Sequence, residues 1–229
     1  LIFLIGMNDP SPTLAYEGAS TNDVLEEEAE KLRLQVLQGG GWVRPAFPLF
    51  KHLKLYDLVR HSKPAGLINV VPATVLGQLR IGTGTYINEK RQQRAAAPVS
   101  PLPDLQIGLQ EYEDRVRTLA QKCQDLGGRC LFLTQPSIYR DDLTPYEQNL
   151  LWFGSVGPSY DPLGYVSAEE MEGALDAYNS ALLETCQQIK LECYDIAPFV
   201  PKDTSVYYDE VHFNEQGARI VARLLTDYL

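Results

Sequence analysis

Hydrophobic residues along this chain follow two spacings, which together predict alternating strands and helices. A continuous apolar run at residues 1–5 is typical of a buried parallel strand, and residues 130–134 (CLFLT) and 193–197 (CYDIA) predict a second buried strand and a third, short one. Apolar residues at helical spacing predict helices over residues 24–36, 47–61, 109–126, 168–189 and 215–228. Because strands alternate with helices along the chain, we expect a mixed α/β fold built on a parallel sheet.

Local signals mark the points where several of these helices begin and end. Ser167 followed by Glu170 is typical of a capping box at a helix start, and Asn214 is suited to cap the last helix. Gly127 and Gly128 predict the end of the helix that precedes residues 130–134. These signals agree with the hydrophobic spacing and therefore support the same boundaries.

One long segment lacks a regular pattern. Residues 63–103 mix Gly, Pro and Thr with a basic patch formed by Lys90, Arg91 and Arg94. We interpret this segment as an irregular insertion or lid, carried by a single domain that covers residues 1–229.

The charge and hydrophobicity of the chain bear on whether it binds nucleic acid or spans a membrane. The chain has 30 acidic and 20 basic residues, a formal net charge of −10, and such a surface repels phosphate backbones. No apolar run approaches the ~18 residues that a membrane-spanning helix needs. We therefore expect no nucleic-acid partner and no membrane span, while the cellular compartment stays open.

The four cysteines form two pairs with the same spacing, Cys123 with Cys130 and Cys186 with Cys193. Each pair joins a predicted helix end to the next predicted strand. The spacing differs from the C-x2-C pattern of zinc sites. Disulfides and free buried thiols are both compatible with these positions, so the pairing stays open.

Two loops carry the residues best suited to chemistry, because active sites of parallel sheets lie at the carboxyl ends of the strands. The loop after the first strand reads GMND (residues 6–9), and the loop before the last helix contains DEVH (residues 209–212). Asp209 could orient the ring of His212 and stabilise its protonated form, as a general base requires. The Asn8 amide could bind an oxyanion, a contribution of about 3 kcal/mol. A helix cap at Asp209 and a plain turn at Asn8 are the structural alternatives.

The segments that contain these loops resemble two blocks of the SGNH (GDSL-type) hydrolases. LIFLIGMNDP resembles their strand followed by G-x-N-D, and YYDEVHFNEQGARIVARLL resembles their D-x-x-H block with the last helix. CLFLTQPSIY, between the two, resembles a strand and loop common in these enzymes. The resemblance covers nearly the whole chain, with residues 63–103 the least typical part.

The resemblance implies both a fold and an activity. The fold would be a flavodoxin-like three-layer α/β/α sandwich with five parallel strands. The activity would be hydrolysis of a carboxylic ester, a small ester substrate, through a serine acyl-enzyme. His212 would be the general base, Asp209 its orienting partner and Asn8 an oxyanion donor, with no cofactor and no metal.

The chain departs from the family pattern at the nucleophile. The family's serine precedes the G-x-N-D block, whereas Ser11, Ser137 and Ser167 lie in no G-D-S sequence. We therefore expect the serine and the first two strands upstream of Leu1. Without those strands residues 1–5 would form an exposed apolar edge, so we expect an N-terminal companion segment, a homodimer or another cover there.

Two further functions are compatible with the same residues. One is a non-catalytic SGNH-like fragment that binds an acylated or carbohydrate ligand. The other is a metal-dependent hydrolase built on Asn8, Asp9, Asp209 and His212, which the small number of histidines, three in all, makes less favourable. The substrate stays open between lipids, thioesters, acetylated sugars and simple esters. Four aromatic residues could line its site or simply pack in a loop: Trp152, Phe153, Tyr160 and Tyr165.

Overall fold

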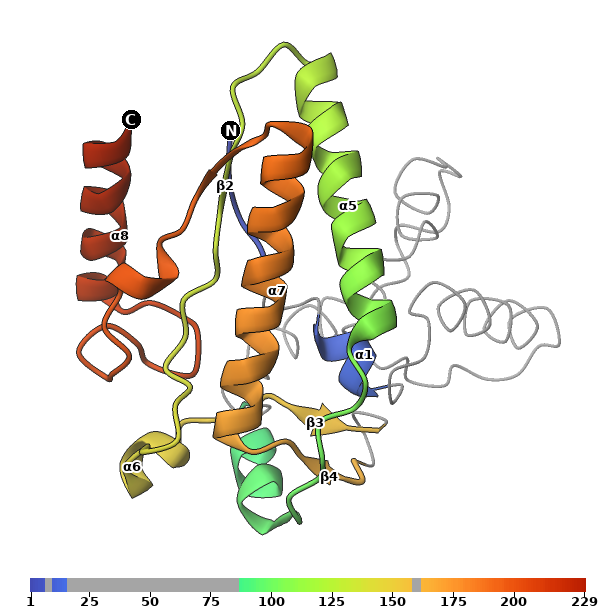
Figure 1. Cartoon of the computed structure of the whole chain (residues 1–229). Helices are drawn as coiled ribbons and strands as arrows, with labels where there is room; N and C mark the ends of the chain where they lie inside the picture. The colour runs from blue at the N-terminus through green and yellow to red at the C-terminus, as the bar shows by residue number, and fades with distance from the viewer. Residues whose placement is uncertain (7–9, 16–86, 158–161) are drawn as a thin grey trace, which may run out of the picture. The chain divides into compact units, whose positions relative to one another are not determined.

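The structure is a computed structural model that describes residues 1–6, 10–15, 87–157 and 162–229 (Figure 1). All of these except residues 87–89 belong to one compact unit. The helices expected over residues 24–36 and 47–61 lie outside the described residues, as does Asn8.

A three-stranded parallel sheet forms the centre of this unit, with the strand order β1-β2-β5. The strands are β1 (Ile2–Leu4), β2 (Leu131–Leu133) and β5 (Glu192–Tyr194). Phe132 of β2 lies opposite Phe3 on one side and Cys193 on the other. The third strand begins one residue earlier than expected and ends sooner, because a 3-10 helix, η3 (Ala197–Phe199), follows it.

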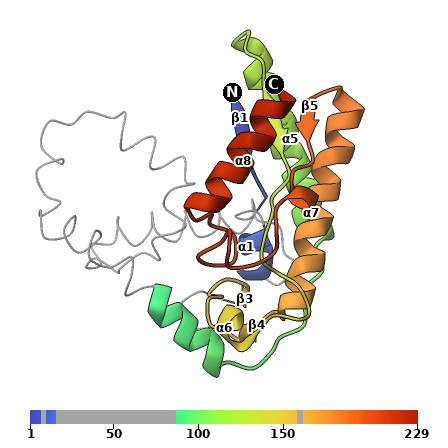
Figure 2. The same cartoon turned by 90° about the vertical axis from the view of Figure 1, so that its left-hand side faces the viewer.

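Helices cover both faces of this sheet (Figures 1 and 2). On one face α5 (Gln106–Asp125) packs against α7 (Ala168–Ile189), and α8 (Glu215–Tyr228) lies on the other. The all-apolar β2 explains this arrangement, because alternate side chains of a strand point to opposite faces. Phe132 packs with apolar residues of α5 and α7, whereas Leu131 and Leu133 pack toward α8. The predicted α/β fold with a parallel sheet is thus confirmed.

The helix ends predicted at Ser167, Asn214 and Gly127 are found there, whereas α5 begins at Gln106, three residues before the predicted start. The Ser167 hydroxyl accepts a hydrogen bond from the amide of Glu170 at 3.1 Å, and the Asn214 side chain accepts one from the amide of Gly217 at 3.0 Å. Gly127 follows α5 with a φ of +66°, a conformation that favours glycine. The Glu170 carboxylate accepts from the Ser167 hydroxyl and from the amide of Leu102.

The segment interpreted as an irregular lid contains a helix over residues 87–96. The sequence INEKRQQRAA has no apolar stripe to reveal it, yet Glu, Lys, Arg, Gln and Ala favour helices strongly. Arg91 and Arg94 of the basic patch donate to main-chain oxygens of Leu150, Phe153 and Val166. Residues 63–86 of the segment lie outside the described residues.

Short elements occupy the long loops. They are α1 (Pro10–Ala15), α6 (Pro145–Gln148) and an antiparallel pair of β3 (Ser155–Val156) with β4 (Gly164–Tyr165). A complete capping box, in which Thr144 and Glu147 bond reciprocally, begins α6. No helix in the described part of the chain is long and apolar enough to cross a membrane.

β1 lies at one edge of the described sheet and pairs with β2. Leu1, Ile2 and Leu4 are 65%, 50% and 39% exposed, so the apolar edge expected from the sequence is present within the described residues. A companion segment or a second copy of the chain over this edge stays a prediction.

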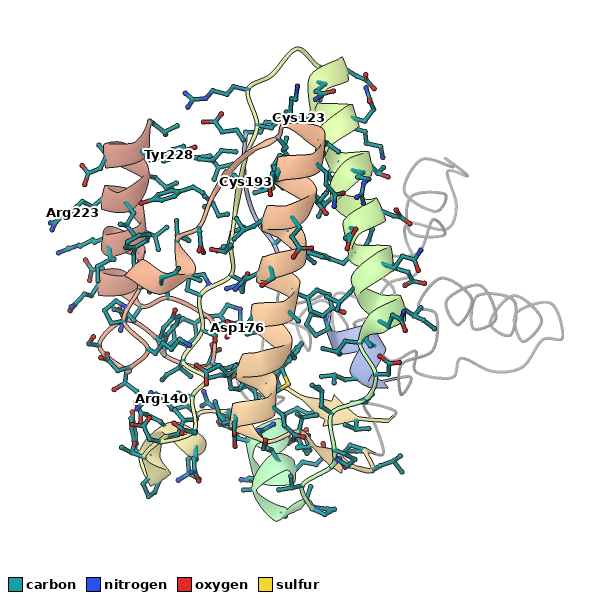
Figure 3. The ribbon with its side chains drawn as sticks, viewed as in Figure 1. Cys123, Arg140, Asp176, Cys193, Arg223 and Tyr228 are labelled. Atoms are coloured by element: carbon teal, nitrogen blue, oxygen red, sulfur yellow. A yellow bond between two sulfur atoms is a disulfide. The ribbon has the colours of Figure 1, made fainter. Side chains whose placement is uncertain are left out.

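Two disulfides tie helix ends to strand starts. Cys123–Cys130 joins the end of α5 to β2, and Cys186–Cys193 joins the end of α7 to β5. Figure 3 labels Cys123 and Cys193, which lie toward the end of the sheet where the strands begin. The structure therefore resolves the alternative that the sequence left open in favour of disulfides.

Replacing either cysteine pair by serines should destabilise the protein. Each bridge has a sequence separation of 7 residues. Closing a loop of that size restricts the unfolded chain enough to contribute about 2–3 kcal/mol to the free energy of unfolding. Urea denaturation of the Cys123→Ser/Cys130→Ser variant and of the Cys186→Ser/Cys193→Ser variant measures the effect. Free thiols titrating in the unreduced, unfolded protein would contradict the pairing.

Candidate active site

A short closed loop between η3 and α8 carries the two residues that the sequence singled out. An antiparallel bridge between Tyr207 and Phe213 closes the loop, and the amide of Asn214 donates to the Val206 oxygen at 2.9 Å. A Cβ atom on Gly217 would lie 2.3 Å from that same oxygen. Glycine at position 217 therefore allows α8 to begin directly against the loop.

Asp209 is buried in this loop, 1% exposed, and its carboxylate accepts several hydrogen bonds. Oδ1 accepts from the amides of Val211 at 3.1 Å and His212 at 2.8 Å, which fixes the turn. The ring atom Nδ1 of His212 lies 2.7 Å from Oδ2 and 3.0 Å from Oδ1. The Asp–His contact predicted from the spacing of the two residues is thus present.

This contact determines which ring nitrogen of His212 is free. A carboxylate only accepts hydrogen bonds, so the neutral imidazole carries its proton on Nδ1, and Nε2 keeps a lone pair. In the described part of the chain no group forms a hydrogen bond with Nε2. The His212 side chain is 53% exposed, and its ring stacks on that of Tyr208 with the centroids 5.6 Å apart. The neutral form of His212 therefore presents Nε2 as its acceptor, which is the tautomer that a general base needs.

A pocket of about 230 Å³ lies beside His212 at the carboxyl ends of β1 and β2. Its walls come from the strand ends, the loop after α6 and the loop before α8, through Leu4, Gln135, Trp152, Phe153, Glu210, Val211, His212 and Phe213. Most of these side chains are apolar or aromatic. The pocket thus has the position that the rule for parallel sheets predicts and a lining suited to an uncharged group.

The two strand ends approach each other closely at this pocket. Gly6 has a φ of +139°, and a Cβ atom there would lie 3.2 Å from Cβ of Gln135. The Gln135 peptide is fixed by Asn179 of α7, which accepts from its amide at 2.7 Å and donates to its oxygen at 3.0 Å. The conformation and the close approach at residue 6 therefore both require glycine.

The loop after α6 forms the opposite wall, and a buried glutamate holds it. Oε1 of Glu210 accepts from the consecutive amides of Trp152 at 3.1 Å and Phe153 at 2.6 Å. The indole N–H of Trp152 donates to Oδ2 of Asp209, with 3.4 Å between the nitrogen and the oxygen. Asp209 and Glu210 are neighbours in sequence, yet one orients His212 and the other holds the facing loop.

Glu210 is fully buried, and burial raises its pKa to about 7. The amides of Trp152 and Phe153 oppose this shift, while the charge of Asp209 adds to it. Oε2 has no hydrogen-bond partner within the described residues. Because Oε1 accepts two amide hydrogens, the proton of the neutral carboxyl group lies on Oε2.

The structure brings together two of the three predicted catalytic residues, Asp209 and His212, and Asn8 lies outside the described residues. Trp152 and Phe153 line the pocket, whereas Tyr165 is buried in β4 beneath Arg94, and Tyr160 lies outside the described residues. Sequence reasoning missed Glu210. Its only local signal is its position inside the DEVH tetrapeptide, which reveals neither its burial nor its partners.

The described residues contain no group of three or more His, Cys, Asp and Glu side chains that could hold a metal ion. Asn8 and Asp9, two members of the four-residue metal site considered above, lie outside them.

Comparison of the chain with models of protein families, with curated proteins and with solved structures finds no match.

Glu210 should make the stability of this protein fall as the pH rises. The unfolded chain releases this proton near pH 4.5, whereas the folded protein keeps it to about pH 7, so the folded state loses stability across that interval. The loss should reach about 3 kcal/mol relative to the Glu210→Gln variant, which has no proton to release. Urea denaturation of both proteins at several pH values measures the difference. Parallel curves between these two pH values would contradict the buried, neutral carboxyl group.

Proposed function

We propose that this chain carries the general base of a carboxylic ester hydrolase of the SGNH type, in which Asp209 and His212 activate a serine. The observation that carries the proposal is the buried Asp209 carboxylate bound to Nδ1 of His212 at 2.7 Å, beside a pocket and with Nε2 free. This is the geometry a serine hydrolase needs in its general base.

The proposed reaction follows from these positions. Nε2 of His212 takes the proton of the serine hydroxyl as that oxygen attacks the ester carbonyl, and the Asp209 carboxylate stabilises the imidazolium that forms. The imidazolium then gives its proton to the departing alcohol, leaving an acyl-enzyme. Water attacks the acyl group in the same way, with His212 accepting its proton and returning it to the serine oxygen as the acid leaves.

The surroundings of the pair support the same reaction. In the proposal the Asn8 amide donates to the oxyanion, and Gly6, two residues earlier in the sequence, lies against Gln135 of the pocket lining. Apolar walls from Trp152, Phe153 and Val211 suit the acyl or alcohol part of a small ester.

The fold supports the proposal only at a coarse level. A parallel sheet with α5 and α7 on one face and α8 on the other is compatible with a flavodoxin-like sandwich. The SGNH assignment itself rests on the two sequence blocks around Asn8 and His212.

Labelling with a fluorophosphonate, which reacts with activated serines, tests the proposed function. The probe is added to the 229-residue chain and, in parallel, to the chain extended upstream of Leu1 as its gene encodes it, and intact mass is measured. We expect no adduct on the chain alone and, on the extended protein, a single adduct that His212→Ala abolishes, and peptide mapping then identifies the serine. An adduct that survives His212→Ala would refute the role of His212, and no adduct on either protein would favour a non-catalytic ligand-binding domain.

Asp209→Asn should reduce kcat for 4-nitrophenyl acetate by about 10⁴-fold while the fold is retained, because the amide no longer holds the imidazole in the correct tautomer. Steady-state kinetics give the effect, and a urea midpoint close to that of the parent chain shows that the loss is chemical. A decrease of only a few fold would show that Asp209 serves to fix the turn before α8 and not as the partner of a general base.

A further inference from the structure

Asp209 and Glu210 are consecutive acidic residues at this site. Asp209 contacts His212, whereas Glu210 has no role in the reaction described above. Glu210 is fully buried, yet its carboxyl group forms no ion pair within the described residues. It instead accepts from two adjacent main-chain amides, those of Trp152 and Phe153, which are 57 or more residues away in sequence. Burying a carboxyl group without an ion pair costs free energy, so a specific role for Glu210 is expected.

The loop that Glu210 holds reaches back to Asp209. The Trp152 indole nitrogen lies 3.4 Å from Oδ2, the same carboxylate oxygen that lies 2.7 Å from Nδ1 of His212. Because the Trp152 amide is fixed by Glu210, the main-chain position from which the indole extends is fixed too. Arg94 completes the support by donating to the Phe153 oxygen.

We propose that Glu210 is a positioning residue of the active site, which acts through Trp152 to hold the Asp209 carboxylate in the orientation that His212 requires. This inference rests on the proposed esterase activity for its kinetic part only. The chain of contacts runs from the Glu210 carboxyl group to the Trp152 amide, and from the indole of Trp152 to Asp209 and His212.

A double-mutant cycle tests the kinetic part, with 4-nitrophenyl acetate as substrate. Glu210→Ala and Trp152→Phe should each lower kcat about tenfold, the contribution of one ordinary hydrogen bond. If Glu210 acts through the indole, the double variant should be hardly slower than either single variant. Multiplying effects, which would reach about a hundredfold, would overturn the proposal.

Conservative variants distinguish positioning from a general loss of structure. Because burial raises the pKa of Glu210 to about 7, glutamine resembles the neutral form that the side chain holds below that pH. Glu210→Gln should therefore recover most of the loss in kcat. Glu210→Asp, which withdraws the acceptor by one methylene group, should not recover it, and it replaces Glu210→Ala if that variant fails to fold.

An NMR measurement that needs no catalysis tests the structural part. The indole proton of Trp152 is one of two such signals in the protein, and Trp42→Phe identifies it. Glu210→Asp and Glu210→Ala should move this signal upfield as the bond to Asp209 is lost, and Glu210→Gln should leave it in place. An indole signal that does not respond to Glu210→Asp or Glu210→Ala would overturn the proposal.

A matched control is available in Glu147, another buried glutamate, 5% exposed, whose carboxyl group also accepts from a main-chain amide, that of Thr144. Glu147→Asp, the counterpart of Glu210→Asp, should change neither kcat nor the indole signal. A wild-type protein that neither binds the fluorophosphonate nor hydrolyses the ester would refute the proposed function alone, because the indole measurement still decides the role of Glu210.

Discussion

The loop before α8 depends on the burial of the Asp209 carboxylate. A buried carboxylate must be matched by donors, and here the donors come from the main chain of its own turn, from the ring of His212 and from the indole of Trp152. Meeting that requirement shapes the turn, sets the tautomer of the histidine and links the loop before α8 to the loop after α6. The buried Asp209 carboxylate thus determines both the conformation of the turn and the tautomer of His212.

The sheet explains why these loops meet. β2 is apolar on both faces and is covered by α5 and α7 on one side and α8 on the other, so its carboxyl end is the first point at which polar side chains can gather. Gln135 follows β2 directly, and its peptide is fixed by Asn179 of α7. The disulfides tie the opposite ends of the strands, so each end of the sheet is fixed by a different kind of bond.

The features that the sequence predicted correctly depend on residues that lie close together in the chain. The strands, the long helices and the caps at Ser167 and Asn214 follow from patterns within a few residues, and the Asp209–His212 contact spans three positions. Glu210 could not be identified in this way, because its burial and its partners come from a loop more than fifty residues away. The helix over residues 87–96 was not predicted for another reason. Its arginines donate to main-chain oxygens, so the helix packs without an apolar stripe. The cysteine spacing was equally compatible with thiols, and only the approach of helix end to strand start decided the pairing.

Main-chain bonds hold the loop after α6 at three consecutive or nearly consecutive residues, Leu150, Trp152 and Phe153. Arg91 binds the Leu150 oxygen, Glu210 binds the amides of Trp152 and Phe153, and Arg94 binds the Phe153 oxygen. None of these bonds depends on which side chain stands at positions 150 or 153. A different side chain at position 153 would therefore change the lining of the pocket while the main-chain bonds of the loop stay the same. Selection for a new ligand would act on such positions first and reach Arg94 or Glu210 last.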